Sequence, residues 1–413
     1  MKMGYKLLKN ATLIDGTGSD PREFVSVLIE DNKIKEITTD NSHSPSYVDE
    51  VYDCRGNTLM PGLIDAHMHL GLVEIEVINL ARRNAPGLMA ARMFKNLKEA
   101  LDQGYTSARD AGGADVGFKE AVAQGIVPGP RLKICGSVIA QTGGHGDDRV
   151  TSETRPYSEP YLGFRATIAD GVPEVLKASR ENIRRGADFL KVMCGGGCAS
   201  PTQGPETSQY ALEELKAIVD VAESVGSYVA SHSYSNRSIC LSANAGIRTI
   251  EHANLMTKET AALVASKGAY IVPTQITYEI VIEKSRDLIS KFIYDKFVSV
   301  CERGYEAIHH AIDAGIRVGG GSDLTGVNTK YASGAISYQA KVQGPMGAIV
   351  SFTKTNSEIL GIDNVTGTIE EGKLADILVV KGNPLKDIGL FKNHSENMLL
   401  IMQGGVCHKN LLS

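Results

Sequence analysis

The sequence has no concentration of positive charge. Its 413 residues include 43 Lys and Arg against 48 Asp and Glu, a formal net charge of −5, and the basic residues are scattered along the chain. A domain that binds nucleic acid usually carries a basic patch or stripe, because phosphate contacts dominate its affinity. We therefore expect no nucleic-acid partner and a small or neutral ligand instead.

Long apolar runs are also missing. No stretch approaches the roughly 20 apolar residues that a membrane-spanning helix needs. The segment MKMGYKLLKNATLIDG interrupts its apolar positions with Lys and Asn, unlike a signal peptide. The seven cysteines stand singly, without paired spacing, which argues against a disulfide framework. These absences predict a cytoplasmic protein that has no membrane partner.

The pattern of apolar residues changes twice along the chain. Residues 1–60 and 366–413 alternate apolar and polar positions around turn signals, which predicts short antiparallel strands. Residues 61–365 instead alternate strand-like apolar runs with helical stretches, which is typical of β/α units. Eight strand candidates can be counted there: LIDAHMHL, YTSARD, RLKICG, DFLKVM, SYVASH, TIEH, AYIVPT and RVGGGSD. The sequence therefore predicts an α/β fold, with residues 61–365 forming a (β/α)8 TIM-type barrel and both chain ends forming a small β-sandwich-like domain.

Six side chains that can bind a metal ion lie at or near the carboxyl ends of these predicted strands. They are His67, His69, Lys191, His232, His252 and Asp323. Barrel enzymes keep their active sites at this face. In a strand the first two histidines point to the same side, because side chains repeat every second residue, and neutral imidazoles suit zinc. Two histidines alone could be ordinary strand residues, but six such positions predict a metal centre.

Lys191 is the most diagnostic of the six. It lies inside the apolar run DFLKVM, where an unpaired ammonium would be costly to bury. Burial favours the neutral amine, which can take up carbon dioxide and form a carbamate whose two oxygens bridge two cations. The alternative is a buried lysine paired with a neighbouring carboxylate.

Asp323, in VGGGSDLTG, suits a carboxylate that touches a metal ion and takes a proton from water. The preceding glycines would let the backbone approach the site closely. Two competing patterns are weaker. The GGGSD segment lacks the following Lys and Ser/Thr of a phosphate-binding loop. Cys194 and Cys198 have no second pair to complete a tetrahedral metal site, so we interpret them as loop or wall residues.

These six predicted ligands, in their order along the chain, resemble those of the amidohydrolase superfamily. The resemblance is specifically to its two-metal members with a carboxylated lysine. The resemblance extends over nearly the whole chain. It implies two divalent ions, zinc as the first expectation, with the first two histidines and Asp323 on one ion and the other two histidines on the second. A carbamate on Lys191 would bridge both. It further implies attack by a metal-bridging hydroxide, with Asp323 shuttling the proton to the leaving amine, and a homo-oligomer.

Four segments, QTGGHGDDR, KVMCGGGCASPT, ASHSY and IEHANL, are similar to those of Xaa-Pro dipeptidases, arginine/lysine carboxypeptidases and, more distantly, imidazolonepropionases. In the dipeptidases of this branch, a histidine matching His145 assists at the scissile carbonyl and a tyrosine matching Tyr234 contacts the substrate. Otherwise, His145 would cap a loop and Tyr234 would pack at the barrel rim. Cys198 departs from the aliphatic residue expected there. Arg149 and Arg155, in the long loop 142–171, could hold a substrate carboxylate or be solvated surface residues.

These observations predict an enzyme that hydrolyses an amide bond, of the Xaa-Pro dipeptidase or carboxypeptidase type, acting on a dipeptide or another small molecule. Hydrolysis of N-acyl amino acids or cyclic amides is the main alternative. A one-metal deaminase is disfavoured because such enzymes have no use for a bridging Lys191. A non-catalytic scaffold is disfavoured because the ligand set is complete.

Overall fold

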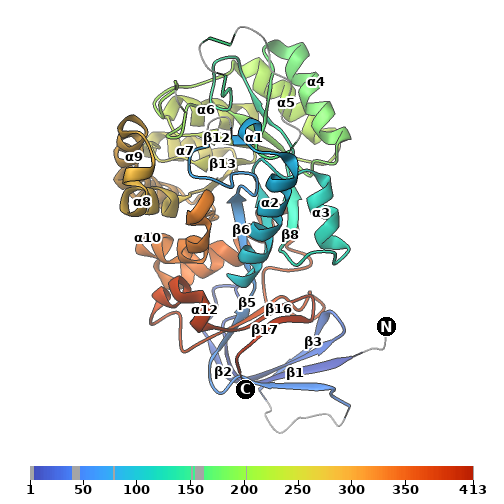
Figure 1. Cartoon of the computed structure of the whole chain (residues 1–413). Helices are drawn as coiled ribbons and strands as arrows, with labels where there is room; N and C mark the ends of the chain where they lie inside the picture. The colour runs from blue at the N-terminus through green and yellow to red at the C-terminus, as the bar shows by residue number, and fades with distance from the viewer. Residues whose placement is uncertain are drawn as a thin grey trace. The chain divides into compact units, whose positions relative to one another are not determined.

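The computed structural model describes residues 4–39, 47–77, 80–149, 152–153, 162–200 and 202–412 (Figure 1). The chain divides into two compact units. Unit 1 consists of Met1–Asp65, Lys98–Ser107 and Lys330–Ser413, and unit 2 consists of Ala66–Leu97 and Ala108–Thr329. Within the described ranges, none of the helices has both the length and the apolar character needed to cross a bilayer.

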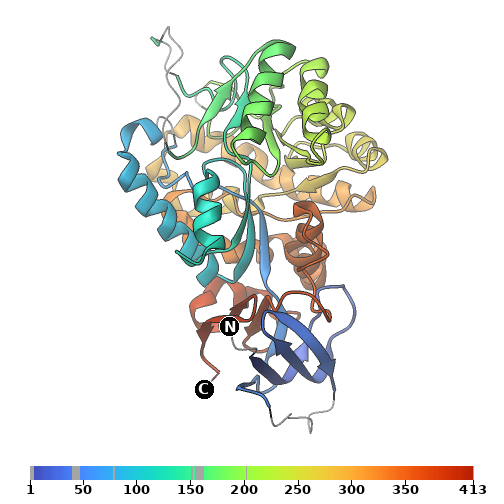
Figure 2. The same ribbon diagram turned by 90° about the vertical axis from the view of Figure 1, so that its right-hand side faces the viewer.

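Unit 1 contains an eight-stranded sheet that draws on both ends of the chain (Figure 2). Its strands are β1 (Tyr5–Leu13), β2 (Arg22–Glu30), β3 (Lys33–Thr38), β4 (Glu50–Asp53), β5 (Thr58–Pro61), β15 (Ile377–Val380), β16 (Met398–Gln403) and β17 (Val406–Asn410). They follow the order β17–β16–β15–β5–β1–β2–β3, and β4 also pairs with β1. Most pairs are antiparallel, but β1 runs parallel to β4 and β5. Strands from both termini thus share one sheet and one apolar core.

Unit 2 is built around parallel strands. They are β8 (Arg131–Ile134), β9 (Val138–Ala140), β10 (Ala166–Ile168), β11 (Leu190–Met193), β12 (Val229–Ser233), β13 (Thr249–His252) and β14 (Tyr270–Val272). Two more strands, β6 (Leu63–Met68) and β7 (Tyr105–Asp110), have their first residues in unit 1 and their last residues in unit 2. One sheet has the order β10–β9–β11–β12–β13–β14, with every pair parallel, and a second has the order β6–β7–β8. Strands β11, β12 and β13 are buried along their whole length, as expected of a parallel sheet that is covered on both faces.

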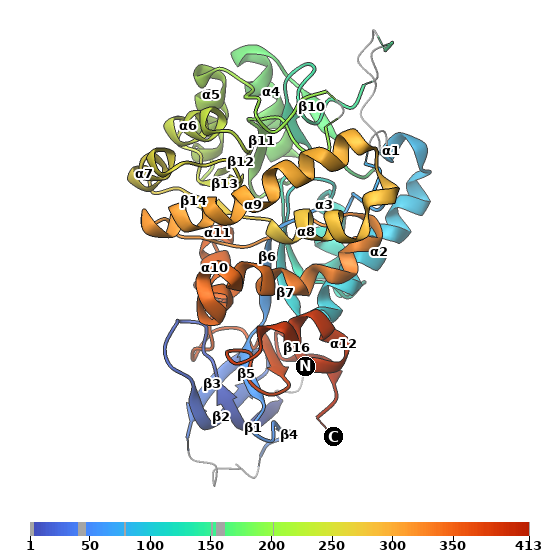
Figure 3. The same ribbon diagram turned by 90° about the vertical axis from the view of Figure 1, so that its left-hand side faces the viewer.

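Helices separate these strands along the chain. They are α1 (Leu80–Arg83), α2 (Pro86–Asp102), α3 (Val116–Ala123), α4 (Gly171–Arg184), α5 (Leu212–Glu223), α6 (Asn236–Ala245), α7 (Lys258–Ser266), α8 (Gln275–Lys284) and α9 (Lys291–Asp313), followed in unit 1 by α10 (Ala335–Val350), α11 (Asn356–Leu360) and α12 (His394–Asn397). Figures 1 and 3 show α4, α5, α6 and α7 following one another along the parallel sheet. The N-termini of α6, α7 and α9 are capped by hydroxyl side chains that accept hydrogen bonds from backbone N–H groups of the first helical turn, which stabilises these helix ends. The capping residues are Ser235, Thr257 and Ser290.

Seven of the eight predicted barrel strands are present, as β6, β7, β8, β11, β12, β13 and β14. The eighth, RVGGGSD, is not a regular strand. It pairs with β14 through a parallel bridge from Val318 to Ile271 and makes further backbone hydrogen bonds to Ile271 and Ala66. One of its glycines, Gly321, lets the backbone approach β6 closely. A Cβ atom on Gly321 would lie 2.5 Å from the His67 Cβ. The sequence also did not reveal the short strands β9 and β10.

Candidate metal centre

Three predicted ligands converge where β6 meets the glycine-rich segment. His67 Nε2 lies 3.3 Å from His69 Nε2 and 3.6 Å from Asp323 Oδ1. His69 Nε2 lies 3.4 Å from the same oxygen. Two ligand atoms on one tetrahedral zinc ion, each about 2.0–2.1 Å from the metal, are about 3.3 Å apart. The three atoms therefore have the spacing of ligands around one ion.

The hydrogen bonds of these two histidines establish which nitrogens carry hydrogen. His67 Nδ1 lies 2.6 Å from Glu251 Oε2, and His69 Nδ1 lies 2.9 Å from the carbonyl oxygen of Gly112. Both oxygens only accept, so both Nδ1 atoms donate. Burial holds the pKa of His67 well below its usual value and lowers the pKa of His69 to about 3, so the rings are neutral. The Nε2 lone pairs thus face each other and a carboxylate, an arrangement that a cation stabilises.

A second pair of imidazoles lies beside this group, at the ends of β12 and β13. His232 Nε2 donates to the carbonyl oxygen of Gly196 at 3.1 Å, which leaves Nδ1 as its ligand atom. His252 Nδ1 lies 2.8 Å from Thr274 Oγ1 and 3.9 Å from Asp323 Oδ2. The two rings are 4.6 Å apart, and burial holds the pKa of both histidines well below its usual value. Neutral rings of this kind can bind a second ion.

Lys191, the second residue of β11, lies on the wall of one cavity and interacts electrostatically with all four histidines. Its side chain is 1% exposed, and its Nζ has no hydrogen-bond partner among the described residues. Burial lowers its pKa. Nearly all buried polar groups in native proteins are paired, so the unpaired amine indicates a missing group. The donor set and this amine both fit a metal centre bridged through Lys191.

The sequence did not reveal the groups that hold the ligands in place. Glu251, next to His252 in β13, accepts from His67 and is itself bound by Arg109 of β7, whose Nη2 lies 2.7 Å and 2.8 Å from the two carboxylate oxygens. Both side chains are fully buried. The signal that could have found them is the one that singled out Lys191, a charged residue within an apolar strand.

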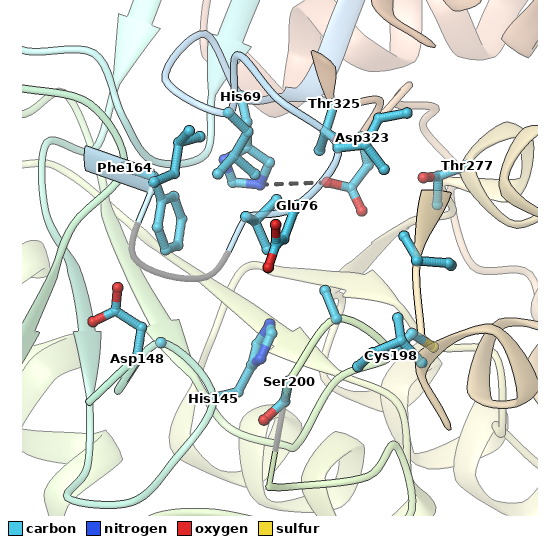
Figure 4. A pocket seen from close by; sticks show the side chains of 18 of the residues that line it. His69, Glu76, His145, Asp148, Phe164, Cys198, Ser200, Thr277, Asp323 and Thr325 are labelled. Atoms are coloured by element: carbon cyan, nitrogen blue, oxygen red, sulfur yellow. Dashed lines mark ion pairs between the residues drawn. The ribbon is translucent and has the colours of Figure 1, made fainter. Parts of the chain in front are cut away.

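A cavity of about 560 Å³ adjoins the centre, and His69, Lys191, His232, His252 and Asp323 form part of its wall. Figure 4 shows His69 and Asp323, joined by their ion pair, on one side and His145, Ser200 and Cys198 on the opposite side of the view. Much of the remaining wall is apolar. It includes Leu72, Ile75, Val77, Leu80, Phe164, Val281, Ile293 and Phe297.

Both residues predicted to contact substrate lie on this wall. The ring of His145 is 4.3 Å from that of His232, and its Nδ1 has no hydrogen-bond partner in the described part of the chain. Burial lowers the pKa of His145 to about 4. The ring of Tyr234 stacks on His252 at 4.9 Å, and its hydroxyl lies 2.8 Å from that of Tyr278. The structure thus brings both residues to the predicted metal ligands.

The other candidates lie elsewhere or have other partners. Arg149 pairs with Asp147 at 2.5 Å and is absent from the described cavity wall, whereas Arg155 lies outside the described residues. Burial raises the pKa of the Cys194 and Cys198 thiols to about 12. Both therefore stay protonated, as expected of wall and core residues rather than of a metal pair.

Comparison with known proteins identifies the family. The model of the amidohydrolase family matches residues 58–406. The chain therefore belongs to the amidohydrolase family and is a hydrolase that acts on C–N bonds. It is also 30% identical over 393 residues to ochratoxinase of Aspergillus niger, with 92% of this chain and 82% of the relative covered.

Two solved structures are similar over almost their full length. One is a prolidase in complex with N-methylphosphonate-L-proline, 35% identical with a TM-score of 0.93, covering 98% of this chain and 100% of the other. The second is a Xaa-Pro dipeptidase with bound methionine, 28% identical with a TM-score of 0.88 and the same coverage. The predicted branch of the superfamily is thereby confirmed.

Proposed function

We propose that the chain is a metal-dependent dipeptidase that cleaves dipeptides with a free C-terminal carboxylate, Xaa-Pro dipeptides first among them. The observation that carries this proposal is one cavity wall that holds three neutral histidines, Asp323, an unpaired Lys191, His145 and Tyr234. The fourth histidine, His67, lies directly beside two of these ligands. The likeness to a prolidase and to a Xaa-Pro dipeptidase supports the substrate class.

Two divalent ions, zinc first, would occupy the centre. The first would be held by His67, His69 and Asp323, the second by His232 and His252, with a carbamate on Lys191 shared by both. When bound, such ions polarise the scissile carbonyl and lower the pKa of water. Forming the carbamate joins the Lys191 nitrogen to the carbon of CO2 with release of one proton, which the lowered pKa of the amine favours.

The remaining steps belong to the side chains. Asp323 is the base: its carboxylate takes a proton from the attacking water and delivers it to the leaving nitrogen. His145 is neutral, since its pKa is about 4, and can donate a hydrogen bond to the carbonyl oxygen of the substrate as charge develops there. The Tyr234 hydroxyl would contact the substrate, and we assign it to the substrate carboxylate. The apolar wall excludes water and takes up the substrate side chain.

A substrate screen tests this proposal. The full chain, loaded with zinc, is assayed against Xaa-Pro, Xaa-Arg/Lys, N-acyl amino acid and cyclic amide libraries, with a Lys191→Ala variant as the matched control. We expect turnover of Xaa-Pro dipeptides by the wild type alone. Turnover of cyclic amides while every dipeptide stays intact would overturn the dipeptidase assignment.

The second candidate is hydrolysis of N-acyl amino acids. The large apolar share of the cavity wall favours it, because an apolar acyl group would be buried there, and the relative from Aspergillus niger is an ochratoxinase. The N-acyl arm of the same screen distinguishes the two. A kcat/KM at least 10 times higher for N-acyl amino acids than for any dipeptide would favour this second function, by about 1.4 kcal/mol in transition-state stabilisation.

The fold that supports this function is, we propose, a closed (β/α)8 barrel. The glycine-rich segment would act as its eighth member, since Gly319 N donates to Ile271 O at 2.9 Å and Ala66 N donates to Gly320 O at 3.1 Å. The sheet of unit 1 would form the β-sandwich-like domain. The domain boundaries, the cytoplasmic location and the homo-oligomer stay predictions, the last of which light scattering on the full chain tests.

A further inference from the structure

A buried ion pair lies directly behind one ligand of the centre. The Glu251 carboxylate accepts four hydrogen bonds: from His67 Nδ1 at 2.6 Å, from Thr249 Oγ1 at 2.6 Å, and from Arg109 Nη2 at 2.7 Å and 2.8 Å. A carboxylate offers about four lone-pair positions, so this one is saturated. It comes from β13, whereas Arg109 comes from β7 and His67 from β6.

Arg109 is equally constrained. Its Nη1 donates to Thr249 Oγ1 at 3.0 Å, its Nε donates to the Ala66 carbonyl oxygen, and its guanidinium lies 5.2 Å from the centre of the Phe189 ring. Such a pair contributes little net stability in a protein interior, because desolvation of both charges offsets their attraction. Net stability therefore does not explain the presence of this ion pair, whereas its hydrogen bond to His67 offers a functional role.

The two metal sites differ in this respect. Behind His67 there is the carboxylate of the ion pair with Arg109, whereas behind His232 there is a carbonyl oxygen and beside His252 there are two hydroxyl groups. An anionic partner on Nδ1 raises the basicity of the opposite nitrogen and fixes the tautomer, which strengthens a metal bond. The partner of His69 is neutral as well, the carbonyl oxygen of Gly112. Among the described hydrogen-bond partners of the four imidazoles, only Glu251 is a carboxylate, and it adds to the difference that Asp323 already makes as a ligand of the first site.

We propose that Glu251, locked in place by Arg109, makes the site of His67 the tighter of the two, so that its ion binds first and is lost last. Glu251 and Arg109 are positioning residues, since neither lies on the cavity wall among the described residues. This inference rests on the proposed two-metal function. It states which of the two sites binds its metal ion more tightly.

The test measures zinc retained by the full chain during titration with a chelator of known affinity, without any activity assay. Glu251→Gln keeps an oxygen to which His67 can donate but removes the charge. In this variant we expect the affinity for the more tightly bound zinc ion to fall by about 10–100-fold and the affinity for the other zinc ion to stay the same. Thr274→Val removes the nearer of the two hydroxyl partners of His252 Nδ1. It is the matched control and should lower the affinity of only the more weakly bound zinc ion.

Because Glu251→Gln leaves the Arg109 charge buried and unpaired, it could unfold the protein. The double variant Arg109→Met/Glu251→Gln removes both charges, and its circular dichroism establishes whether it is folded; it should show the same selective loss. Equal weakening of both equivalents, or unchanged affinity of the tighter one in a folded variant, would overturn the inference. A wild-type chain with fewer than two zinc equivalents would instead count against the proposed function.

Discussion

Replacing Lys191 by Met should move metal content and metal-free stability in opposite directions. In the metal-free protein the Lys191 amine is buried without a hydrogen-bond partner among the described residues. An unsatisfied buried polar group costs about 1–3 kcal/mol, and a Met side chain of similar length fills the same space without that cost. We therefore expect the free energy of unfolding to rise by about 1–3 kcal/mol, while bound zinc falls from two equivalents per chain.

Two measurements check this prediction. Urea unfolding of the metal-stripped proteins measures stability, and elemental analysis after dialysis against zinc measures retention. Lys296→Met is the matched control, because the Lys296 amine is also buried but donates to the Ser200 carbonyl oxygen. Loss of that bond should destabilise the protein by about 1 kcal/mol and leave zinc retention unchanged. A metal-free Lys191→Met protein that is less stable than wild type, or that keeps two equivalents, would refute the reasoning.

Three further predictions concern catalysis and acid stability. Asp323→Asn should lower kcat for dipeptide hydrolysis by about 10²–10⁴-fold, because the amide cannot take a proton; steady-state kinetics with zinc content measured alongside checks it, and a loss below 10-fold would contradict it. Tyr234→Phe should raise KM for substrates with a free carboxylate by about 10-fold or more, because it removes a hydrogen bond to a charged group. It should leave KM for the matching amides unchanged. Stability of the metal-free protein should fall as the pH drops from 6.5 towards 4, because His145, with a pKa of about 4, stays neutral when folded but is protonated when unfolded. In His145→Gln, the slope of the unfolding free energy against pH should be smaller by up to about 1.4 kcal/mol per pH unit between pH 6.5 and 4. Urea titrations at several pH values measure this slope. An unchanged slope would argue against a buried neutral His145.

Local pattern predicted much of the fold, since seven of the eight strands lie where apolar runs placed them. The exception shows the limit of such patterns. Apolar periodicity reports on the burial of side chains, whereas the glycines before Asp323 have no side chain. One of them, Gly321, allows the close approach of the backbone to His67. Sequence spacing could not show that this segment departs from regular strand geometry.

By itself the sequence determined which residues can bind metal, because the chemistry of His, Lys and Asp and their positions at strand ends are local properties. It also determined that Lys191 needs an explanation. Only the tertiary structure decided which nitrogen carries a hydrogen in His67, His69 and His232. The deciding acceptors, Glu251, Gly112 and Gly196, belong to other segments of the chain. The pairing of Arg109 with Glu251 spans 142 residues. Such contacts depend on how the strands pack in space. That packing places the Glu251 carboxylate behind His67 and neutral carbonyl groups behind His69 and His232.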